Sequence, residues 1–130
     1  MTVRVNAVGV VATDFRTTLA FYERLGCTFP DPTEPHAEAD LGGVRLMVDS
    51  AASMAQLGET EIGPRHGIAL AAEAGSPEEV DALYSELEAA GHGSRKPFDA
   101  PWGQRYASVT DPDGTSVDLY AWLPGRKPEA

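Results

Sequence analysis

Cysteine is nearly absent from this 130-residue chain, in which Cys27 is the only one. A single cysteine excludes an internal disulfide and any metal site built from several thiolates. Its position between Gly26 and Thr28 is typical of the start of a strand. We therefore interpret Cys27 as a small buried residue rather than as a nucleophile.

Basic residues are also scarce. Ten Lys and Arg stand against twenty Asp and Glu, so the net charge at pH 7 is -10. Nucleic acids and anionic membrane surfaces are poor partners for such a chain, because their phosphates bind Lys and Arg. The same charge would attract a cationic small molecule, although it also serves solubility alone.

Long hydrophobic runs are the third absence, and no apolar run is long enough to span a bilayer. The opening MTVRVNAVGVV is too short, and too poor in leading positive charge, for a signal peptide. We therefore expect a cytoplasmic protein. The apolar fraction of 42% and the charged fraction of 23% are ordinary for a globular domain that buries a core.

The first half of the chain follows the order strand, helix, three strands. A buried strand is predicted from about Val3 to Ala12, and the helix TDFRTTLAFYERLG follows it. Asp14 can cap this helix, and Gly26 supplies its left-handed stop. Strands are then predicted in CTFP, HAEADL and VRLMVD, with a Gly-Gly hairpin turn at 42–43. A short helical connection capped by Ser50 ends this half.

The second half repeats the same order. HGIALAAE predicts a buried strand from about His66 to Glu73, and SPEEVDALYSELEAAG predicts a helix. Ser76 and Glu79 form a capping box at its start. Three strands follow in GHGSRKPFD, GQRYASVTD and TSVDLYAW, and DPDG at 111–114 predicts the turn between the last two.

An internal repeat of this size decides the fold more firmly than any single element, and the two copies are offset by roughly 60 residues. We predict one domain of the α+β class over residues 1–130. It contains two βαβββ modules, at about 1–58 and 62–124, and a frayed tail at 125–130.

The repeated plan and two signatures resemble a known superfamily. ATDFRTTLAFYERLG and VTDPDGTSVDLY are similar to sequences of the vicinal oxygen chelate superfamily. That group includes glyoxalase I, extradiol dioxygenases, fosfomycin-modifying transferases and bleomycin resistance proteins. The resemblance covers nearly the whole chain. It implies cupped mixed sheets, with helices on the convex side and the ligand on the concave side.

In the metalloenzymes of that group, four concave positions bind a divalent metal, usually through a His and a Glu in each half. At the matching positions this sequence has Ala7, Met47, Gly67 and Asp118. Ala and Gly have no donor atom, and a Met thioether suits copper(I) better than magnesium, manganese or zinc. His66 lies one residue too early, which turns it to the opposite face of its strand. We therefore predict no metal and no other cofactor.

A metal site outside the family pattern is left open in His36, Glu38 and Asp49, although their spacing matches no recognised metal motif.

Alternation along the strands predicts which side chains face the cup. Phe98 and Trp102 lie in PFDAPWGQ, which we expect to form a loop at the cavity mouth with aromatic walls. The candidate ligand-binding residues are His36, Glu38, Arg45, Met47, Asp49, Phe98, Trp102, Tyr106, Asp118 and Tyr120.

Most of these candidates have a plain structural alternative. Met47 could fill the core, Trp102 could fill the core or an interface, and Glu38 could be a solvated strand residue. Asp118 is harder to explain in this way, because a carboxylate that faces a cup needs a partner. Either Arg45 or a cation on the ligand could supply it.

These features favour a metal-free small-molecule binding protein similar to the bleomycin resistance branch, rather than an enzyme. It would sequester an aromatic or cationic natural product or antibiotic. The resemblance also implies a homodimer, often with exchanged strands. Two alternatives stay open: a metal-dependent lyase, dioxygenase or thiol transferase of the glyoxalase type, and a metal-free enzyme that uses Asp118 or Glu38 as acid or base.

Overall fold

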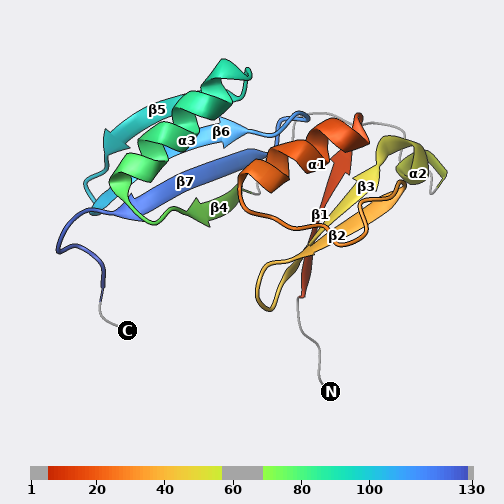
Figure 1. The fold of residues 1–130 in the computed structure, drawn as a ribbon, viewed down its shortest axis with the longest axis horizontal. Helices are drawn as coiled ribbons and strands as arrows, with labels where there is room; N and C mark the ends of the chain where they lie inside the picture. The colour runs from red at the N-terminus through yellow and green to blue at the C-terminus, as the bar shows by residue number, and fades with distance from the viewer. Residues whose placement is uncertain (1–5, 57–68, 129–130) are drawn as a thin grey trace. The chain divides into compact units, whose positions relative to one another are not determined.

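The chain folds as two compact units, Met1–Pro64 and Arg65–Ala130, called unit 1 and unit 2 below. The structure is a computed structural model that describes residues 6–56 and 69–128. Each unit contains one mixed β-sheet and its own helices (Figure 1). Among the described residues, no helix has the length and apolar character needed to cross a membrane.

Unit 1 has a three-stranded sheet in the order β1-β3-β2. Its elements are β1 (Ala7–Ala12), α1 (Phe15–Arg24), β2 (His36–Asp40), β3 (Arg45–Ser50) and α2 (Ala51–Gln56). β1 pairs with β3 in parallel, and β2 pairs with β3 antiparallel. The central strand β3 therefore carries the side chains that can reach both neighbours.

Local signals set the ends of α1 as predicted. The Asp14 side chain accepts a hydrogen bond from the Thr17 backbone N–H at 3.0 Å, which caps the first turn. At the other end Gly26 has φ of 93°, and Cys27 N–H donates to the Tyr22 carbonyl at 3.0 Å. This left-handed stop is a Schellman motif, which closes the helix without further partners.

The predicted strand CTFP is wrong. Residues 27–30 form no strand, and unit 1 has one strand fewer than the βαβββ plan. The reason is that the Cys27 N–H already bonds back to the end of α1. Phe29, only 7% exposed, then anchors the segment through its side chain rather than through a backbone ladder. Cys27 itself is half-buried, and burial raises the pKa of its thiol.

Unit 2 has a four-stranded sheet in the order β4-β7-β6-β5. Its elements are β4 (Ala69–Glu73), α3 (Pro77–Ala89), β5 (Gly93–Asp99), β6 (Gln104–Thr110) and β7 (Ser116–Trp122). β4 pairs with β7 in parallel, and the other two pairs are antiparallel. This unit has the full βαβββ plan, so the two mixed sheets confirm the predicted α+β class.

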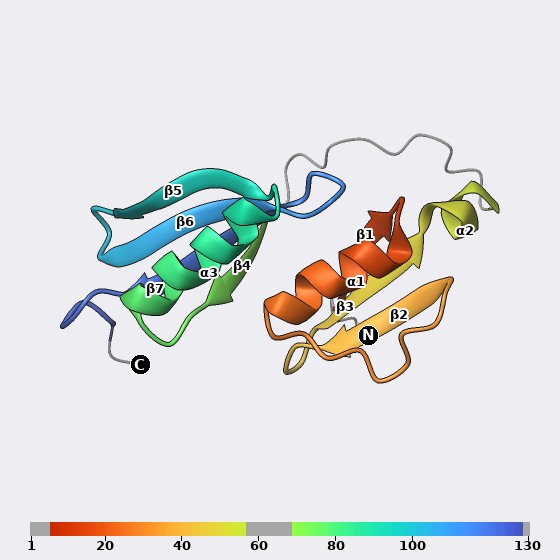
Figure 2. The same cartoon turned by 45° about the horizontal axis from the view of Figure 1, so that its top comes forward.

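Helix α3 lies along one face of its sheet and packs on β5, β6 and β7 (Figure 2). Ser76 Oγ accepts from the Glu79 N–H at 3.2 Å, which confirms the predicted cap. The Glu79 carboxylate accepts from the Gly75 N–H at 2.7 Å. In the usual capping box the donor would be the N–H of the N-cap residue, which lies one position later. Arg105 on β6 donates to Asp81 of the helix at 2.8 Å and so ties α3 to the sheet.

The DPDG turn is formed as predicted and joins β6 to β7. The buried Asp111 carboxylate accepts from the backbone N–H groups of Asp113 at 2.9 Å and Thr115 at 2.8 Å. Gly114 has φ of 92°, a conformation that favours glycine. These contacts set the register in which β7 meets β6.

The first strand of each unit is less buried than predicted, because β1 and β4 lie at sheet edges. In β1 only Val10 and Ala12 are buried, and in β4 Leu70 is half-buried while Ala71 is exposed. The predicted segments of these strands before residue 6 and at 66–68 lie outside the described residues. Residues 124–126, which overlap the start of the predicted frayed tail, form a turn in which the Arg126 N–H donates to the Leu123 carbonyl at 3.0 Å.

Candidate functional site

Each sheet has a buried tier of side chains on one face and a half-exposed tier on the other. On β3, Leu46 and Val48 are buried while Arg45, Met47 and Asp49 are half-buried. On β2, buried Ala37 and Ala39 alternate with His36, Glu38 and Asp40, which are exposed or half-buried. The same alternation holds on β7, where Val117, Leu119 and Ala121 are buried. The predicted alternation is therefore confirmed on these strands.

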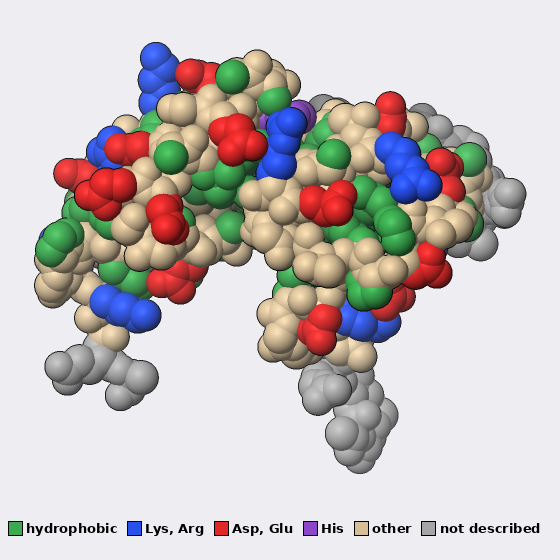
Figure 3. All heavy atoms as spheres, viewed as in Figure 1, with side chains coloured by type: hydrophobic (Ala, Val, Ile, Leu, Met, Phe, Trp, Pro, Cys, Tyr) green, Lys and Arg blue, Asp and Glu red, His purple; other side chains and the backbone are tan. Residues whose placement is uncertain are grey.

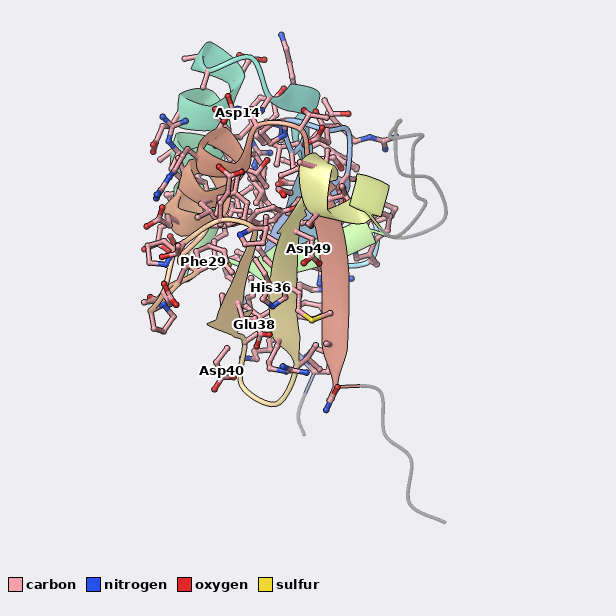
Figure 4. All side chains as sticks on the ribbon, turned by 90° about the vertical axis from the view of Figure 1, so that its right-hand side faces the viewer. Asp14, Phe29, His36, Glu38, Asp40 and Asp49 are labelled. Atoms are coloured by element: carbon pink, nitrogen blue, oxygen red, sulfur yellow. The ribbon has the colours of Figure 1, made fainter. Side chains whose placement is uncertain are left out.

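The half-exposed tier of unit 1 is called the polar face, and it consists of His36, Glu38, Arg45, Met47 and Asp49. His36 lies opposite Asp49 in the β2–β3 register. Its Nδ1 lies 2.6 Å from Asp49 Oδ1, and its Nε2 lies 2.7 Å from Glu38 Oε2 (Figure 4). Arg45 Nη1 donates to the other Glu38 oxygen at 2.8 Å.

This chain of charges favours the protonated form of His36, because an imidazolium can donate from both ring nitrogens to the two carboxylates. Hydrogen bonds to Asp49 and then Glu38 raise the pKa of His36. Hydrogen bonds from His36 and then Arg45 lower the pKa of Glu38. Both oxygens of Glu38 therefore accept from side chains, while the side chain as a whole is still 38% exposed to solvent.

Two pockets border the polar face. The larger holds about 440 Å³ and the smaller about 320 Å³. Pro30 and Glu38 line both, while Asp40 and Arg45 belong to the larger one and His36 to the smaller one. Neither lining contains Phe, Tyr or Trp, and both combine Pro30 with charged side chains.

The residues at the family's metal positions do not fit a metal. Ala7 offers no donor, Met47 offers only a thioether, and Gly67 lies outside the described residues and has no side-chain donor. The alternative metal site in His36, Glu38 and Asp49 is not formed either, because His36 is hydrogen-bonded to both carboxylates. Within residues 6–56 and 69–128, no group of three or more His, Cys, Asp or Glu is arranged to hold a metal ion.

The half-exposed tier of unit 2 is called the aromatic face, and it consists of Phe98, Trp102, Tyr106, Asp118 and Tyr120. β6 places Tyr106 opposite Tyr120 and Ser108 opposite Asp118. Ser108 Oγ donates to Asp118 Oδ1 at 2.9 Å. Burial raises the pKa of Tyr106 to about 12, and its hydrogen bond to Asp118 adds to the rise.

Three of these rings form an edge-to-face cluster. The ring centroids are 5.3 Å apart for Trp102 and Tyr106, 6.1 Å for Phe98 and Tyr106, and 6.3 Å for Phe98 and Trp102. Trp102 is 51% exposed, so it is not a core filler. Its indole N–H donates to Gln104 Oε1 at 2.8 Å, which fixes the ring. Phe98 belongs to β5, not to the predicted loop, while Trp102 lies in the following turn.

Each member of the suggested Arg45–Asp118 pair has a partner within its own unit. Arg45 pairs with Glu38, whereas Asp118 accepts from the Ser108 hydroxyl. Within the described part of unit 2, no Lys, Arg or His makes an ion pair with Asp118. The negative charge of Asp118 is therefore met by hydroxyl groups, not by a cation.

One further side chain belongs with the aromatic face but was missed from the sequence. The Arg95 guanidinium carbon lies 5.8 Å from the Phe98 ring centroid, and Arg95 pairs with Ser108 across β5 and β6. Irregular pairing of β5 puts it there. The sequence shows only Pro97 inside a predicted strand as a sign of such irregularity.

Mixed sheets covered by helices on one face, with half-exposed polar or aromatic tiers on the other, define a protein of the glyoxalase fold class. The family model of the Glyoxalase/Bleomycin resistance protein/Dioxygenase superfamily matches residues 4–119. The chain therefore belongs to that superfamily, which confirms the resemblance seen in its signatures.

Solved structures of similar fold span the range of that superfamily. A glyoxalase/bleomycin resistance protein/dioxygenase from Nocardioides is 27% identical with a TM-score of 0.69, covering 100% of this chain and 90% of that one. A lactoylglutathione lyase from Agrobacterium tumefaciens is 20% identical with a TM-score of 0.64, covering 93% and 95%. A fosfomycin resistance protein from Listeria monocytogenes is 17% identical with a TM-score of 0.71, covering 98% and 100%. The last two show the fold alone, and no curated protein matches the chain.

Proposed function

We propose that this chain is a metal-free binding protein that holds an aromatic, cationic small molecule on the aromatic face of unit 2. The observation that carries the proposal is the Asp118 carboxylate, which lies beside a ring cluster and has hydroxyl partners but no cationic partner within the described part of unit 2. A natural product or antibiotic of this chemistry would supply the missing positive charge.

Electrostatics support a cation at this place. The chain carries a net charge of -10, and acidic side chains outnumber basic ones in the view of Figure 3. Such a field raises the local concentration of cations. At short range, a hydrogen bond to a charged group contributes about 1.5–3 kcal/mol, and a cation over an aromatic ring adds roughly 0.5–2 kcal/mol.

The ring cluster supports an aromatic ligand. Trp102 presents half of its surface to solvent while Phe98 and Tyr106 hold it from the side. An exposed tryptophan held in one orientation is a favourable stacking surface, because little side-chain entropy is lost when a planar molecule covers it.

The residues of both faces weigh against the two enzymatic alternatives. The metal-dependent reading has Asp118 as the only carboxylate at the four family positions, and one carboxylate with a thioether is too few donors for a hard cation. A metal-free acid–base reading cannot use Glu38 freely, because His36 and Arg45 occupy its two oxygens. Asp118 would be left as the sole candidate base, which a test of turnover can address.

Calorimetric titration with two aromatic cations, bleomycin and berberine, tests the proposal. We expect at least one dissociation constant well below millimolar. Asp118→Asn should weaken binding by about tenfold or more, because it removes the charge but not the shape. Glu86→Gln is the matched control, since it also removes one negative charge but lies on α3. Binding no tighter than millimolar for both compounds would contradict the proposal.

Two further measurements separate the alternatives. Elemental analysis of untreated protein should find no stoichiometric zinc, nickel, manganese or iron, and finding one would overturn the metal-free reading. Turnover of a bound compound that is lost in Asp118→Asn while binding is retained would instead favour catalysis.

We also propose that the chain acts as a homodimer, as the family resemblance implies. Light scattering in solution should then give twice the chain mass of 13.8 kDa. A mass equal to one chain at micromolar concentration would contradict this part of the proposal.

A further inference from the structure

We propose that Arg95 is a ligand-binding residue of the aromatic face, and that it selects bipolar aromatic molecules, with an ammonium at one end and a carboxylate at the other. This inference rests on the proposed function and narrows its ligand class. Three observations carry it: the irregular pairing that places Arg95, the row of side chains it joins, and the partners it has.

The pairing of β5 with β6 is irregular on both sides of Arg95. Gly93 lies opposite Val109, Arg95 opposite Ser108, and Phe98 opposite Tyr106, with a register shift in each interval. Without the first shift, Arg95 would lie opposite Ala107, whose side chain is fully buried in the tier beneath α3. The shift turns the guanidinium to the open face instead. Bulges of this kind re-aim side chains beside functional sites and interrupt regular pairing to do so.

The result is a row of three polar side chains across the sheet. Arg95 on β5 lies opposite Ser108 on β6, and Ser108 lies opposite Asp118 on β7. Neighbouring strands are about 4.8 Å apart, so the backbones of Arg95 and Asp118 are separated by roughly 10 Å. The next row along the strands holds Phe98 and Tyr106. A ligand ring stacked on Phe98 and Tyr106 would then lie beside Arg95 towards β5 and beside Asp118 towards β7.

The guanidinium of Arg95 is available to a ligand. Arg105 of the same unit pairs with two carboxylates, but within the described part of unit 2 no carboxylate forms an ion pair with Arg95. Its positive charge nevertheless reaches the site, since it opposes the rise in the pKa of Tyr106. A guanidinium fork binds a carboxylate through two parallel hydrogen bonds. A ligand with a cation alone would leave this group unmatched and would be repelled by it.

Three para-substituted benzene probes test the selection: 4-(aminomethyl)phenylacetate, which is bipolar, 4-methylbenzylamine, which is only cationic, and 4-methylphenylacetate, which is only anionic. Titrations followed by NMR measure their dissociation constants with the full chain. We expect the bipolar probe to bind about tenfold tighter than the cation, and the anion to bind most weakly.

Variants then assign the effect to Arg95. Arg95→Gln should reduce the affinity for the bipolar probe to that for the cation, and should leave or slightly improve binding of the cation itself. Arg95→Lys should retain part of the preference, because it keeps the charge but not the fork. Lys96→Gln is the matched control, since it removes the same charge from the neighbouring residue of β5. It should change the dissociation constant of each probe by no more than about twofold.

The outcomes separate this inference from the proposed function. If wild-type protein binds the cation and Arg95→Gln binds the bipolar probe as tightly as wild type, the role of Arg95 is refuted while the proposed function stands. If Lys96→Gln has the same effect as Arg95→Gln, general charge explains the preference and the inference also fails. If no probe binds and the aromatic cations do not bind either, both are overturned.

Discussion

The open faces of the two units differ in chemistry, although both are made by the same alternation of buried and half-exposed strand residues. On the polar face, Arg45, Glu38, His36 and Asp49 form a continuous chain of opposite charges. On the aromatic face, the charges of Asp118 and Arg95 lie in one row and have no ion-pair partner within the described part of unit 2.

The difference shows how a repeated fold can divide its roles. Charges that neutralise one another within a unit have little left to offer a ligand, because a ligand must first replace the existing partners. Asp118, which accepts from a hydroxyl group, and Arg95, which lies over an aromatic ring, can still attract a ligand of opposite charge. The repeat thus sets the architecture in both units, while the choice of side chains on one tier sets what each can bind.

The largest effects should come from the buried tier, in which the two units are alike. Leu46 on β3 and Leu119 on β7 are each 1% exposed. Leu46→Ala and Leu119→Ala should each lower the free energy of unfolding by about 2–5 kcal/mol, since both leave a cavity. Urea denaturation measures this, with Met47→Ala and Tyr120→Ala as open-tier controls. An equal loss for Leu119→Ala and Tyr120→Ala would show that the open tier of unit 2 is core.

The ionisation of Tyr106 tests whether Asp118 carries a negative charge beside the rings of the aromatic face. Ultraviolet difference titration should show one tyrosine ionising at about pH 12, assigned by its loss in Tyr106→Phe. The folded pKa lies above that of the unfolded chain, near 10, so the stabilisation is complete below pH 10 and disappears as the pH rises through 12. Asp118→Asn should lower the pKa, because the carboxylate no longer opposes the phenolate. An unchanged pKa would mean that burial alone sets it.

Removing the N-terminal cap of α1 or of α3 should lower the free energy of unfolding by a similar amount in each unit. Asp14→Ala and Ser76→Ala each remove one acceptor from a helix N-terminus. Each should cost about 1 kcal/mol in the free energy of unfolding. Asp14→Ser and Ser76→Asp serve as controls that keep an acceptor and should restore most of it. A loss well above this value at one cap would show that its side chain has a second role.

The smallest effect should come from the polar face. NMR titration of His36 should give a pKa above 6.5, and both Asp49→Asn and Glu38→Gln should lower it. Because the folded pKa is raised, this stabilisation is present at low pH and is lost as the pH rises through it. Glu38 also contributes stability, but its dependence on pH runs in the opposite direction. Because the folded pKa of Glu38 is lowered, its contribution is present at higher pH and is lost as the pH falls through that pKa. Both side chains are well exposed, so salt should weaken each effect. A His36 pKa at or below 6.5 would show that the charge chain does not form in solution.

Much of the architecture could be predicted because its signals are local. The caps at Asp14 and Ser76, the Gly-Gly hairpin and the DPDG turn depend on residues within a few positions of one another. The period-two pattern likewise placed His36 and Asp118 on half-exposed tiers. CTFP misled because its composition suits a strand, while its first N–H was already committed to the end of α1.

By itself, the sequence determined the superfamily plan, the two cap positions and the absence of donors at Ala7, Met47 and Gly67, since each follows from residue type or short spacing. The tertiary structure alone decided that Arg45 pairs with Glu38 and that Arg95 lies in the row of Asp118. The physical reason is register. Partners across a sheet are set by how strands distant in sequence align, and one bulge reverses the face of every side chain beyond it.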